Sequence, residues 1–141
     1  MFNISAFTNI GTLRAINQDS ILVNSEILNS GEVHLENQSS CKCFVADGVG
    51  GSNAGEFASN FVLERINLIS DLETQNEIEL INEHLLSISN SDEKLKGAAT
   101  TLTGLVIIEE NIRVFHAGDS QLWLMRNNMF LKITKDHVLD D

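Results

Sequence analysis

The 141-residue sequence contains no proline, only nine lysines and arginines, and no apolar run long enough to cross a membrane. Without proline, repeats or a low-complexity linker, nothing indicates an internal domain boundary, so we expect one domain over residues 1–141. The few basic residues form no cluster, which argues against a nucleic-acid partner because phosphate backbones are held by clustered Lys and Arg. The N-terminus lacks the pattern of a secretory signal, so we expect a cytoplasmic protein with no membrane partner.

Cysteine is also scarce, and Cys41 and Cys43 are the two present. Their spacing places them on one face of a strand and too close along the chain for an ordinary disulfide. No further soft ligands lie nearby in sequence, which favours structural thiols over a metal site. Acidic residues are plentiful: twenty Asp and Glu give a net charge of −11, typical of a solvated acidic surface and compatible with a cation-binding pocket.

The alternation of apolar residues predicts short strands before the first helix. A turn is expected at Asn29-Ser30-Gly31, with a short return strand around Val33 and Leu35. The three longer predicted strands are Ile4–Phe7, Ser20–Leu28 and Cys41–Ala46.

Two helices are predicted in the middle of the chain. The first should begin near Ala54, with Asn53 and Glu56 forming a capping box, and Thr74 and Glu77 repeat this pattern before the second. Apolar stripes that we assign to the core are Phe57, Phe61, Val62, Ile66 and Ile69 on the first helix, and Ile78, Ile81, Leu85 and Ile88 on the second.

From Thr100 onward the pattern changes to short strands separated by turn residues, which predicts an antiparallel meander. Residues Leu105–Ile108 are apolar on both faces of their strand, so we expect cover on both sides and a layered architecture. The predicted strands are Leu102–Ile108, Ile112–Ala117, Gln121–Arg126 and Met129–Ile133.

A glycine-rich segment, V-A-D-G-V-G-G-S-N-A-G-E-F-A-S (Val45–Ser59), connects a predicted strand to a predicted helix. It does not match a phosphate-binding Walker A loop, because it has no Gly-Lys-Ser/Thr ending. It does not match the dinucleotide-binding fingerprint either, because Asn53 occupies the position of the third glycine when counted from Gly48. The simplest interpretation is a flexible turn with positive φ at one or more glycines.

Asp47 within this segment favours a metal site, because a carboxylate alone would repel phosphate. Mg²⁺ and Mn²⁺ prefer carboxylate, carbonyl and water oxygens, so Asp47 and the Gly48 carbonyl are candidate ligands. A bound metal would turn the acidic turn into a phosphate-attracting site.

Four further motifs follow a fixed order: G-x-x-R-x-x-N-x-D-S from Gly11, A-T-T-L from Ala99, G-D-S from Gly118 and T-x-D-H from Thr134. Together with the glycine-rich segment, this set resembles the metal-dependent protein phosphatase 2C family in its bacterial form. The resemblance implies an α+β fold, a four-layer sandwich of two antiparallel β-sheets flanked by helices. It also implies a protein serine/threonine phosphatase that uses a two-metal-activated water, two or three Mn²⁺ or Mg²⁺ ions, and a phosphorylated protein substrate of a Ser/Thr kinase.

The resemblance assigns roles to individual residues. Arg14 would grip the substrate phosphate, a role suited to a planar bidentate donor. Further metal ligands implied by the family are Asp47 as the bridge between two metals, the Gly48 carbonyl, Asp19 with Gln18 near the second metal, and Asp119 near an additional metal.

Each of these residues also has a structural interpretation. Arg14 could be a surface ion-pair residue, Asp119 a turn former and Asp19 the end of a strand. His116 lies between apolar neighbours and is expected to be structural, and His137 supports the fold more than the chemistry.

The sequence departs from the family pattern at three places. Gln18 stands where many members have glutamate, and Val49 where eukaryotic members have a histidine. The family's later Asp-Gly and Asp-Asn metal motifs have no match before Asp141, so the chain is interpreted as the N-terminal portion of a domain truncated at its C-terminus.

The truncation leaves a second function class open. The chain could be a non-catalytic phosphatase-like interaction module, or an inactive fragment without the C-terminal metal ligands. An acidic Ca²⁺-binding domain ranks below both, since the sequence has no D-x-D-x-D-G loop. We expect the isolated chain to bind metal weakly and to expose sheet edges and an apolar face.

Overall fold

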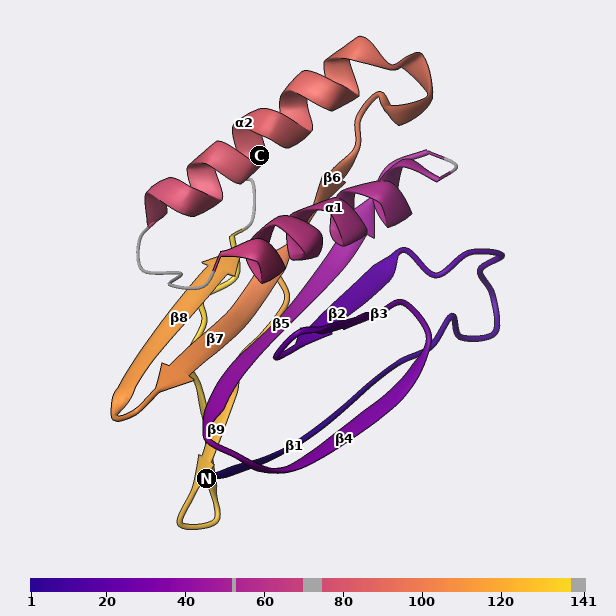
Figure 1. Cartoon of the computed structure of the whole chain (residues 1–141). Helices are drawn as coiled ribbons and strands as arrows, with labels where there is room; N and C mark the ends of the chain where they lie inside the picture. Colours follow the sequence, from indigo (N-terminus) through magenta and orange to yellow (C-terminus); the bar gives the residue numbers. More distant parts are fainter. Residues whose placement is uncertain (52, 70–74, 138–141) are drawn as a thin grey trace.

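The computed structural model describes residues 1–51, 53–69 and 75–137. Figure 1 shows two helices on one side of a strongly twisted antiparallel sheet. None of the helices in these ranges is long and apolar enough to span a membrane. In chain order the elements are β1 (Phe2–Thr8), β2 (Asp19–Val23), β3 (Glu26–Leu28), β4 (Gly31–Gln38), β5 (Ser40–Val49), α1 (Ala54–Leu68), α2 (Gln75–Ser91), a 3₁₀ turn (Glu93–Leu95), β6 (Ala99–Thr100), β7 (Leu102–Ile108), β8 (Asn111–Ala117), β9 (Trp123–Arg126) and β10 (Met129–Lys132).

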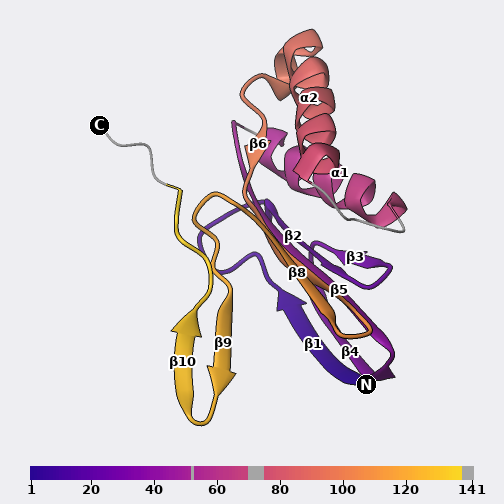
Figure 2. The ribbon, with the colours of Figure 1, turned by 90° about the vertical axis from the view of Figure 1, so that its left-hand side faces the viewer.

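The main sheet has the order β3-β2-β5-β7-β8, and the short β6 pairs with the end of β5. Strand β5 is central, because it pairs with both β2 and β7 in antiparallel register. Two smaller pairs, β1 with β4 and β9 with β10, form separate two-stranded sheets. Figure 2 shows the helices on one face of the main sheet and the β9–β10 hairpin on the opposite side.

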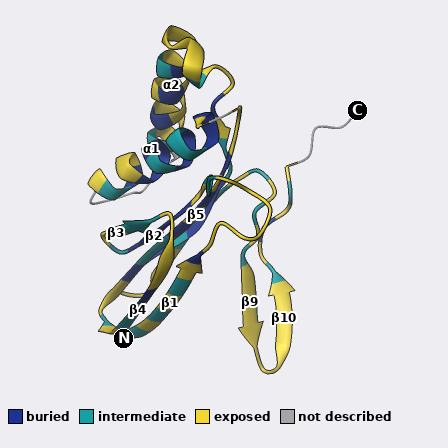
Figure 3. Ribbon diagram, turned by 90° about the vertical axis from the view of Figure 1, so that its right-hand side faces the viewer, coloured by how far each residue is buried: buried dark blue, intermediate teal, exposed yellow. Residues whose placement is uncertain are grey.

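The hydrophobic core lies between the helices and one face of the main sheet. Helix α1 packs directly on β5 and β2, and α2 packs on α1. Leu22, Leu63 and Ile66 are completely buried there, and Figure 3 shows the buried residues gathered on α1 and the central strands. The predicted apolar stripes are therefore core, as expected, with Phe61, Val62, Ile66, Ile81 and Leu85 among its buried members.

Helix α1 begins at Ala54 as predicted, but the capping box is not formed. The Asn53 side chain makes no capping hydrogen bond, and Asn53 has φ −96° and ψ 5°. A capping residue normally has extended backbone geometry, which aims its side chain at the free amides. The Asn53 backbone carbonyl still accepts the first helical bond, from Phe57 N at 3.0 Å. The predicted cap at Thr74 lies outside the described residues.

The predicted strand Ser20–Leu28 is two strands, not one. β2 and β3 form a tight hairpin, in which Asn24 adopts the left-handed conformation with φ 55°. Asparagine tolerates this conformation, and the Asn24 Oδ1 accepts a 3.0 Å bond from Lys42 N on the neighbouring strand β5. The return strand around Val33 and Leu35 is longer than predicted, and β4 pairs with β1.

The predicted four-strand meander is wrong in its pairing. β7 pairs with β8 and β9 with β10, but β8 and β9 belong to different sheets. Gly118 follows β8 with φ 106°, a conformation suited to glycine, and the chain leaves the main sheet there. Cover on both faces of β7 is incomplete: Val106 is buried on the face toward the helices, whereas Leu105 and Ile107 on the opposite face are only half-buried.

The β9–β10 hairpin exposes apolar side chains on both of its faces. Met125 and Phe130, which are paired on one face of the hairpin, are 63% and 70% exposed, and Leu131 on the other face is 59% exposed. Figure 3 shows the hairpin as almost wholly exposed. Contiguous exposed apolar surface of this kind marks an association or aggregation surface.

We therefore expect the 141-residue chain to self-associate at micromolar concentrations, and light scattering across a dilution series would measure this. Replacing Met125 and Phe130 together by lysine should shift the chain toward monomer. Leu80→Lys, at an exposed position on α2, is the control and should leave association unchanged. A wild-type chain that stays monomeric at high concentration would contradict the prediction.

Lys42 of β5 holds the C-terminal end of α1. Its ammonium group donates to the carbonyl oxygens of Ile66 at 2.5 Å and Ile69 at 2.8 Å. Burial lowers the pKa of Lys42. The carbonyls at the C-terminal end of α1 supply the negative partial charge that a half-buried ammonium requires.

Lys42→Met should lower the free energy of unfolding by about 2 kcal/mol, because the helix loses a charged hydrogen-bond donor at its C-terminus. Chemical denaturation would measure the change. Lys96→Met is the matched control: Lys96 is exposed and pairs with the exposed Glu93 at 3.6 Å, so its removal should have little effect. Equal losses of stability in the two variants would show that Lys42 does not stabilise the C-terminal end of α1.

Candidate functional site

Asp47, near the end of β5, lies directly opposite Asp19, the first residue of β2, in the antiparallel register. The pKa of Asp47 is raised, first by burial, then by repulsion from and a hydrogen bond with Asp19, and then by the charge of Asp119. Arg14, in the loop between β1 and β2, acts on this pKa in the opposite direction. The structure thus brings together four charged residues that the sequence placed in three separate motifs.

Asn17 holds the loop that precedes Asp19 in place. Its Oδ1 accepts a bond from the Asp19 amide at 3.1 Å, and its Nδ2 donates to Thr8 Oγ1 at 2.9 Å and to the Asn29 carbonyl at 2.6 Å. The loop before β2 is therefore tied to the end of β1 and to the turn before β4. Sequence reasoning did not assign this role, although Asn17 is the asparagine of the G-x-x-R-x-x-N-x-D-S motif.

The glycine-rich turn is shaped by close backbone contact. A Cβ on Gly48 would lie 2.0 Å from the Gly55 carbonyl oxygen, so α1 approaches β5 more closely than any side chain permits. Gly50 has φ 147°, which confirms the expected positive φ in this turn. Gln18 contacts the same turn: its carbonyl accepts from Gly48 N at 3.1 Å and its Nε2 donates to the Gly50 carbonyl at 3.4 Å.

Thr101, from the A-T-T-L motif, connects Asp47 to the G-D-S motif. The Asp47 amide donates to Thr101 Oγ1 at 3.0 Å, and the Thr101 amide donates to the Asp47 carbonyl at 2.9 Å. Thr101 Oγ1 also shares a 2.7 Å hydrogen bond with Ser120 Oγ. The turn that carries Asp119 is thereby fixed beside Asp47.

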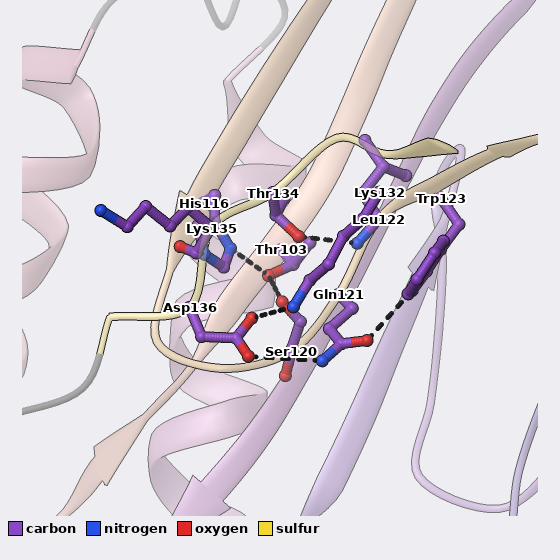
Figure 4. A network of polar contacts seen from close by, with 10 residues as sticks. All are labelled: Thr103, His116, Ser120, Gln121, Leu122, Trp123, Lys132, Thr134, Lys135 and Asp136. Atoms are coloured by element: carbon purple, nitrogen blue, oxygen red, sulfur yellow. Dashed lines mark hydrogen bonds and ion pairs between the residues drawn. The ribbon is translucent and has the colours of Figure 1, made fainter. Parts of the chain in front are cut away.

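A second polar network, shown in Figure 4, attaches the T-x-D-H segment to β8. His116 Nε2 donates to the Lys135 carbonyl at 2.9 Å, and Nδ1 shares a 2.8 Å bond with Thr103 Oγ1. The Thr103 hydroxyl contacts the Ser120 carbonyl at 3.1 Å. Both ring nitrogens of His116 are engaged, in agreement with the structural role predicted for it.

The other residues of the T-x-D-H segment also bond within this network. Lys132 Nζ donates to Asp136 at 2.6 Å, which lowers the pKa of Asp136. The His137 amide donates to the Gly118 carbonyl at 2.8 Å, and the His116 and His137 rings lie 4.8 Å apart. These contacts agree with the prediction that His137 supports the fold.

The two facing carboxylates line a hollow of about 360 Å³ at this end of the sheet. Its walls include Asp19, Asp47, Thr8, Val45 and Ser120. The atoms available as metal ligands are carboxylate and carbonyl oxygens, which suit Mg²⁺ or Mn²⁺ and not a softer metal. Within the described ranges, however, no three His, Cys, Asp or Glu side chains converge closely enough to hold an ion by themselves.

Comparison with known proteins agrees with this arrangement. The sequence model of the family "Protein phosphatase 2C" matches residues 11–141. The chain belongs to this family. It is 32% identical over 146 residues to the protein phosphatase PhpP of Streptococcus pneumoniae serotype 2 (strain D39), covering 96% of this chain and 55% of PhpP. The serine/threonine phosphatase Stp of Listeria welshimeri is 31% identical over 110 residues, covering 67% and 42% of the two chains.

Solved phosphatase structures share the fold. A crystal structure of a bacterial serine phosphatase matches with a TM-score of 0.76 and 26% identity, covering 97% of this chain and 56% of that one. The catalytic domain of the phosphatase PstP, in complex with two manganese ions, has a TM-score of 0.71 and 24% identity, with 96% and 55% covered. The predicted α+β architecture of antiparallel sheets flanked by helices is thus confirmed, and the chain spans about half the length of the curated relatives it matches.

Proposed function

We propose that residues 1–141 are part of a single metal-dependent phosphatase domain that hydrolyses phosphoserine and phosphothreonine in proteins. The observation that carries the proposal is the pairing of Asp19 with Asp47 across β2 and β5, beside the charges of Asp119 and Arg14. Membership of the protein phosphatase 2C family and the named activities of its bacterial relatives support the same reaction.

The proposed metal ligands fit a divalent cation on chemical grounds. Asp47 faces Asp19, and repulsion between the two carboxylates contributes to the raised pKa of Asp47. A cation between the two carboxylates would remove that repulsion. Bound Mn²⁺ or Mg²⁺ would supply Lewis-acid activation of water and neutralise phosphate charge. The proposed ligand set is Asp47, Asp19, Gln18, Asp119 and the Gly48 carbonyl, and the two manganese ions in PstP are consistent with it.

Arg14 is the proposed phosphate-binding residue. It lies in the exposed loop between β1 and β2, and its charge reaches Asp47. A guanidinium group can hold two phosphate oxygens at once, which fixes the orientation of the phosphorus relative to the carboxylates. The proposed partner is a phosphorylated protein, the product of a Ser/Thr kinase.

The proposal is tested with the protein expressed from its complete open reading frame. We expect phosphate release from a phosphothreonine peptide that requires Mn²⁺ or Mg²⁺ and is lost on chelation. Metal-loaded protein that binds the peptide without turnover would instead support a non-catalytic phosphatase-like module, the second candidate. That candidate is favoured by the lack of three converging metal-ligating side chains in the described part of the chain.

For the same reason, we expect the 141-residue chain alone to bind Mn²⁺ with a Kd above about 100 µM and to show negligible turnover. The five proposed ligands, shared between two or three ions, leave many coordination positions to water, so each ion is held weakly. Titration calorimetry and a phosphopeptide assay measure the two quantities. Low-micromolar binding together with turnover would show that the chain is self-sufficient.

A further inference from the structure

Ser59 of α1 is completely buried beside the candidate metal site, although its side chain is polar. Its hydroxyl lies at a junction of three elements: the start of β2, the end of β5 and the first turns of α1. We infer that Ser59 is a positioning residue, which holds the Gln18–Asp19 backbone and Gly48 in the arrangement that the metal centre needs. The link to metal binding rests on the proposed function, whereas the positioning itself rests on the contacts below.

The Gln18 carbonyl is the centre of this junction. It accepts one hydrogen bond from Ser59 Oγ at 2.7 Å and a second from the Gly48 amide at 3.1 Å. One carbonyl oxygen therefore fastens the residue before Asp19 both to α1 and to the residue after Asp47. A shift of this carbonyl would move a candidate ligand on each strand.

The direction of the bonds follows from the single proton of each hydroxyl. Ser59 is 2.7 Å from the Gln18 carbonyl and 3.1 Å from that of Glu56 in its own helix, so the shorter bond to Gln18 is the better one. Ser20 Oγ lies 3.0 Å from Ser59 Oγ and then serves as the donor. The result is a relay from Ser20 through Ser59 to Gln18.

Burial makes this relay rigid. Ser20 and Ser59 are both 0% exposed, so water cannot replace a lost partner, and an unsatisfied buried group is costly. Asp19 lies in the chain between Gln18 and Ser20, the two residues the relay holds. The close Gly48–Gly55 contact brings α1 near enough to β5 for a side chain as short as serine to reach the Gln18 carbonyl.

Ser59→Ala tests the inference in the protein expressed from its complete open reading frame. Ser89→Ala is the matched control, because Ser89 is also a buried helical serine whose hydroxyl donates to a carbonyl, that of Leu95 at 2.8 Å. Ser59→Ala loses two hydrogen bonds, to the Gln18 carbonyl and from Ser20, and Ser89→Ala loses one, but α2 carries no candidate ligand. Both variants should therefore lose thermal stability, Ser59→Ala more than Ser89→Ala.

The deciding measurement is amide hydrogen exchange of Gly48 in the metal-free protein, since this amide donates to the Gln18 carbonyl. Ser59→Ala should speed its exchange about 10-fold relative to Ser89→Ala, because the carbonyl loses its second donor. Ser20→Ala, which leaves the Ser59–Gln18 bond in place, should give a smaller increase and remains informative if Ser59→Ala does not fold. Unchanged Gly48 exchange in both Ser59→Ala and Ser20→Ala would overturn the positioning role.

Mn²⁺ affinity, followed by electron paramagnetic resonance, tests the link to the metal. Ser59→Ala should weaken binding about 10-fold and Ser89→Ala should not, as is usual for residues that orient ligands. Faster Gly48 exchange with unchanged Mn²⁺ affinity would overturn the link to the metal centre. Faster Gly48 exchange in Ser59→Ala, together with a wild-type protein that binds no Mn²⁺, would support the junction and overturn the proposed function instead.

Discussion

Asp47→Asn is expected to reduce Mn²⁺-dependent turnover of a phosphothreonine peptide by about 1,000-fold or more in the protein from the complete open reading frame. Asp47 lies at the centre of the candidate site, because it faces Asp19 in the strand register and the charges of Asp119 and Arg14 act on its pKa. An asparagine keeps the shape of the side chain but removes the charge that would bind a cation.

The size of the effect follows from the charge chemistry. Stabilisation of transition-state charge by a bound cation contributes several kcal/mol, and each 1.36 kcal/mol is a factor of ten in rate, so about 4 kcal/mol corresponds to the stated loss. A residue that merely supported the fold would lower activity only in proportion to the protein unfolded. Turnover should therefore fall while the circular dichroism spectrum stays that of the folded protein.

Stability provides an independent signature of the same substitution. Burial and the neighbouring carboxylates raise the pKa of Asp47, which means that the ionised side chain destabilises the metal-free protein. Asp47→Asn removes this repulsion, so the metal-free variant should unfold at a higher temperature than the wild type, the exchange of stability for function common at active sites.

Asp92→Asn is the control for both measurements. Asp92 is exposed, and its carboxylate accepts a 2.9 Å bond from the Lys94 amide, which an asparagine oxygen can also accept. Activity and melting temperature should be unchanged. An Asp47→Asn protein with near-normal turnover would remove Asp47 from the mechanism.

Among the charged residues of the candidate site, Asp47 was selected by its local chemistry, and the others by the family resemblance of the ordered motif set. Arg14, Asp19, Asp47 and Asp119 are brought together as expected. The residues that hold them in place, Asn17, Ser59 and Thr101, were not predicted. The partners of Ser59 and Thr101 are distant in the sequence: the Ser59–Gln18 bond spans 41 residues and the Asp47–Thr101 bond spans 54.

The same distinction explains which parts of the fold were predicted. The start of α1 at Ala54 and the strand Leu102–Ile108 follow from local periodicity, and both agree with the structure. The pairing of strands depends on partners elsewhere in the chain, so the separation of β9 from β8 could not be inferred from alternation. The split at Asn24 was missed because an asparagine in left-handed conformation interrupts an otherwise strand-like run.

The contact between Gly48 and Gly55 was missed for a related reason, since a glycine in a turn suggests unusual φ before it suggests close packing. A Cβ at Gly48 would lie 2.0 Å from the Gly55 oxygen, 2.5 Å from the Gly55 carbon and 2.6 Å from the Gln18 oxygen. All three atoms belong to the backbone, so no side chain can rotate away. Only a displacement of α1 or of the start of β2 would make room.

Gly48→Ala should therefore lower the free energy of unfolding by about 3 kcal/mol or more, at the upper end of overpacking effects, and disturb the Gln18 junction. Gly51→Ala is a matched control three residues away, with no atom within 4 Å of its Cβ. It should be neutral or stabilise the protein by up to about 1 kcal/mol, because alanine restricts the unfolded chain. Urea denaturation of both variants measures the difference, and equal stability would show that α1 can move away from β5 without loss.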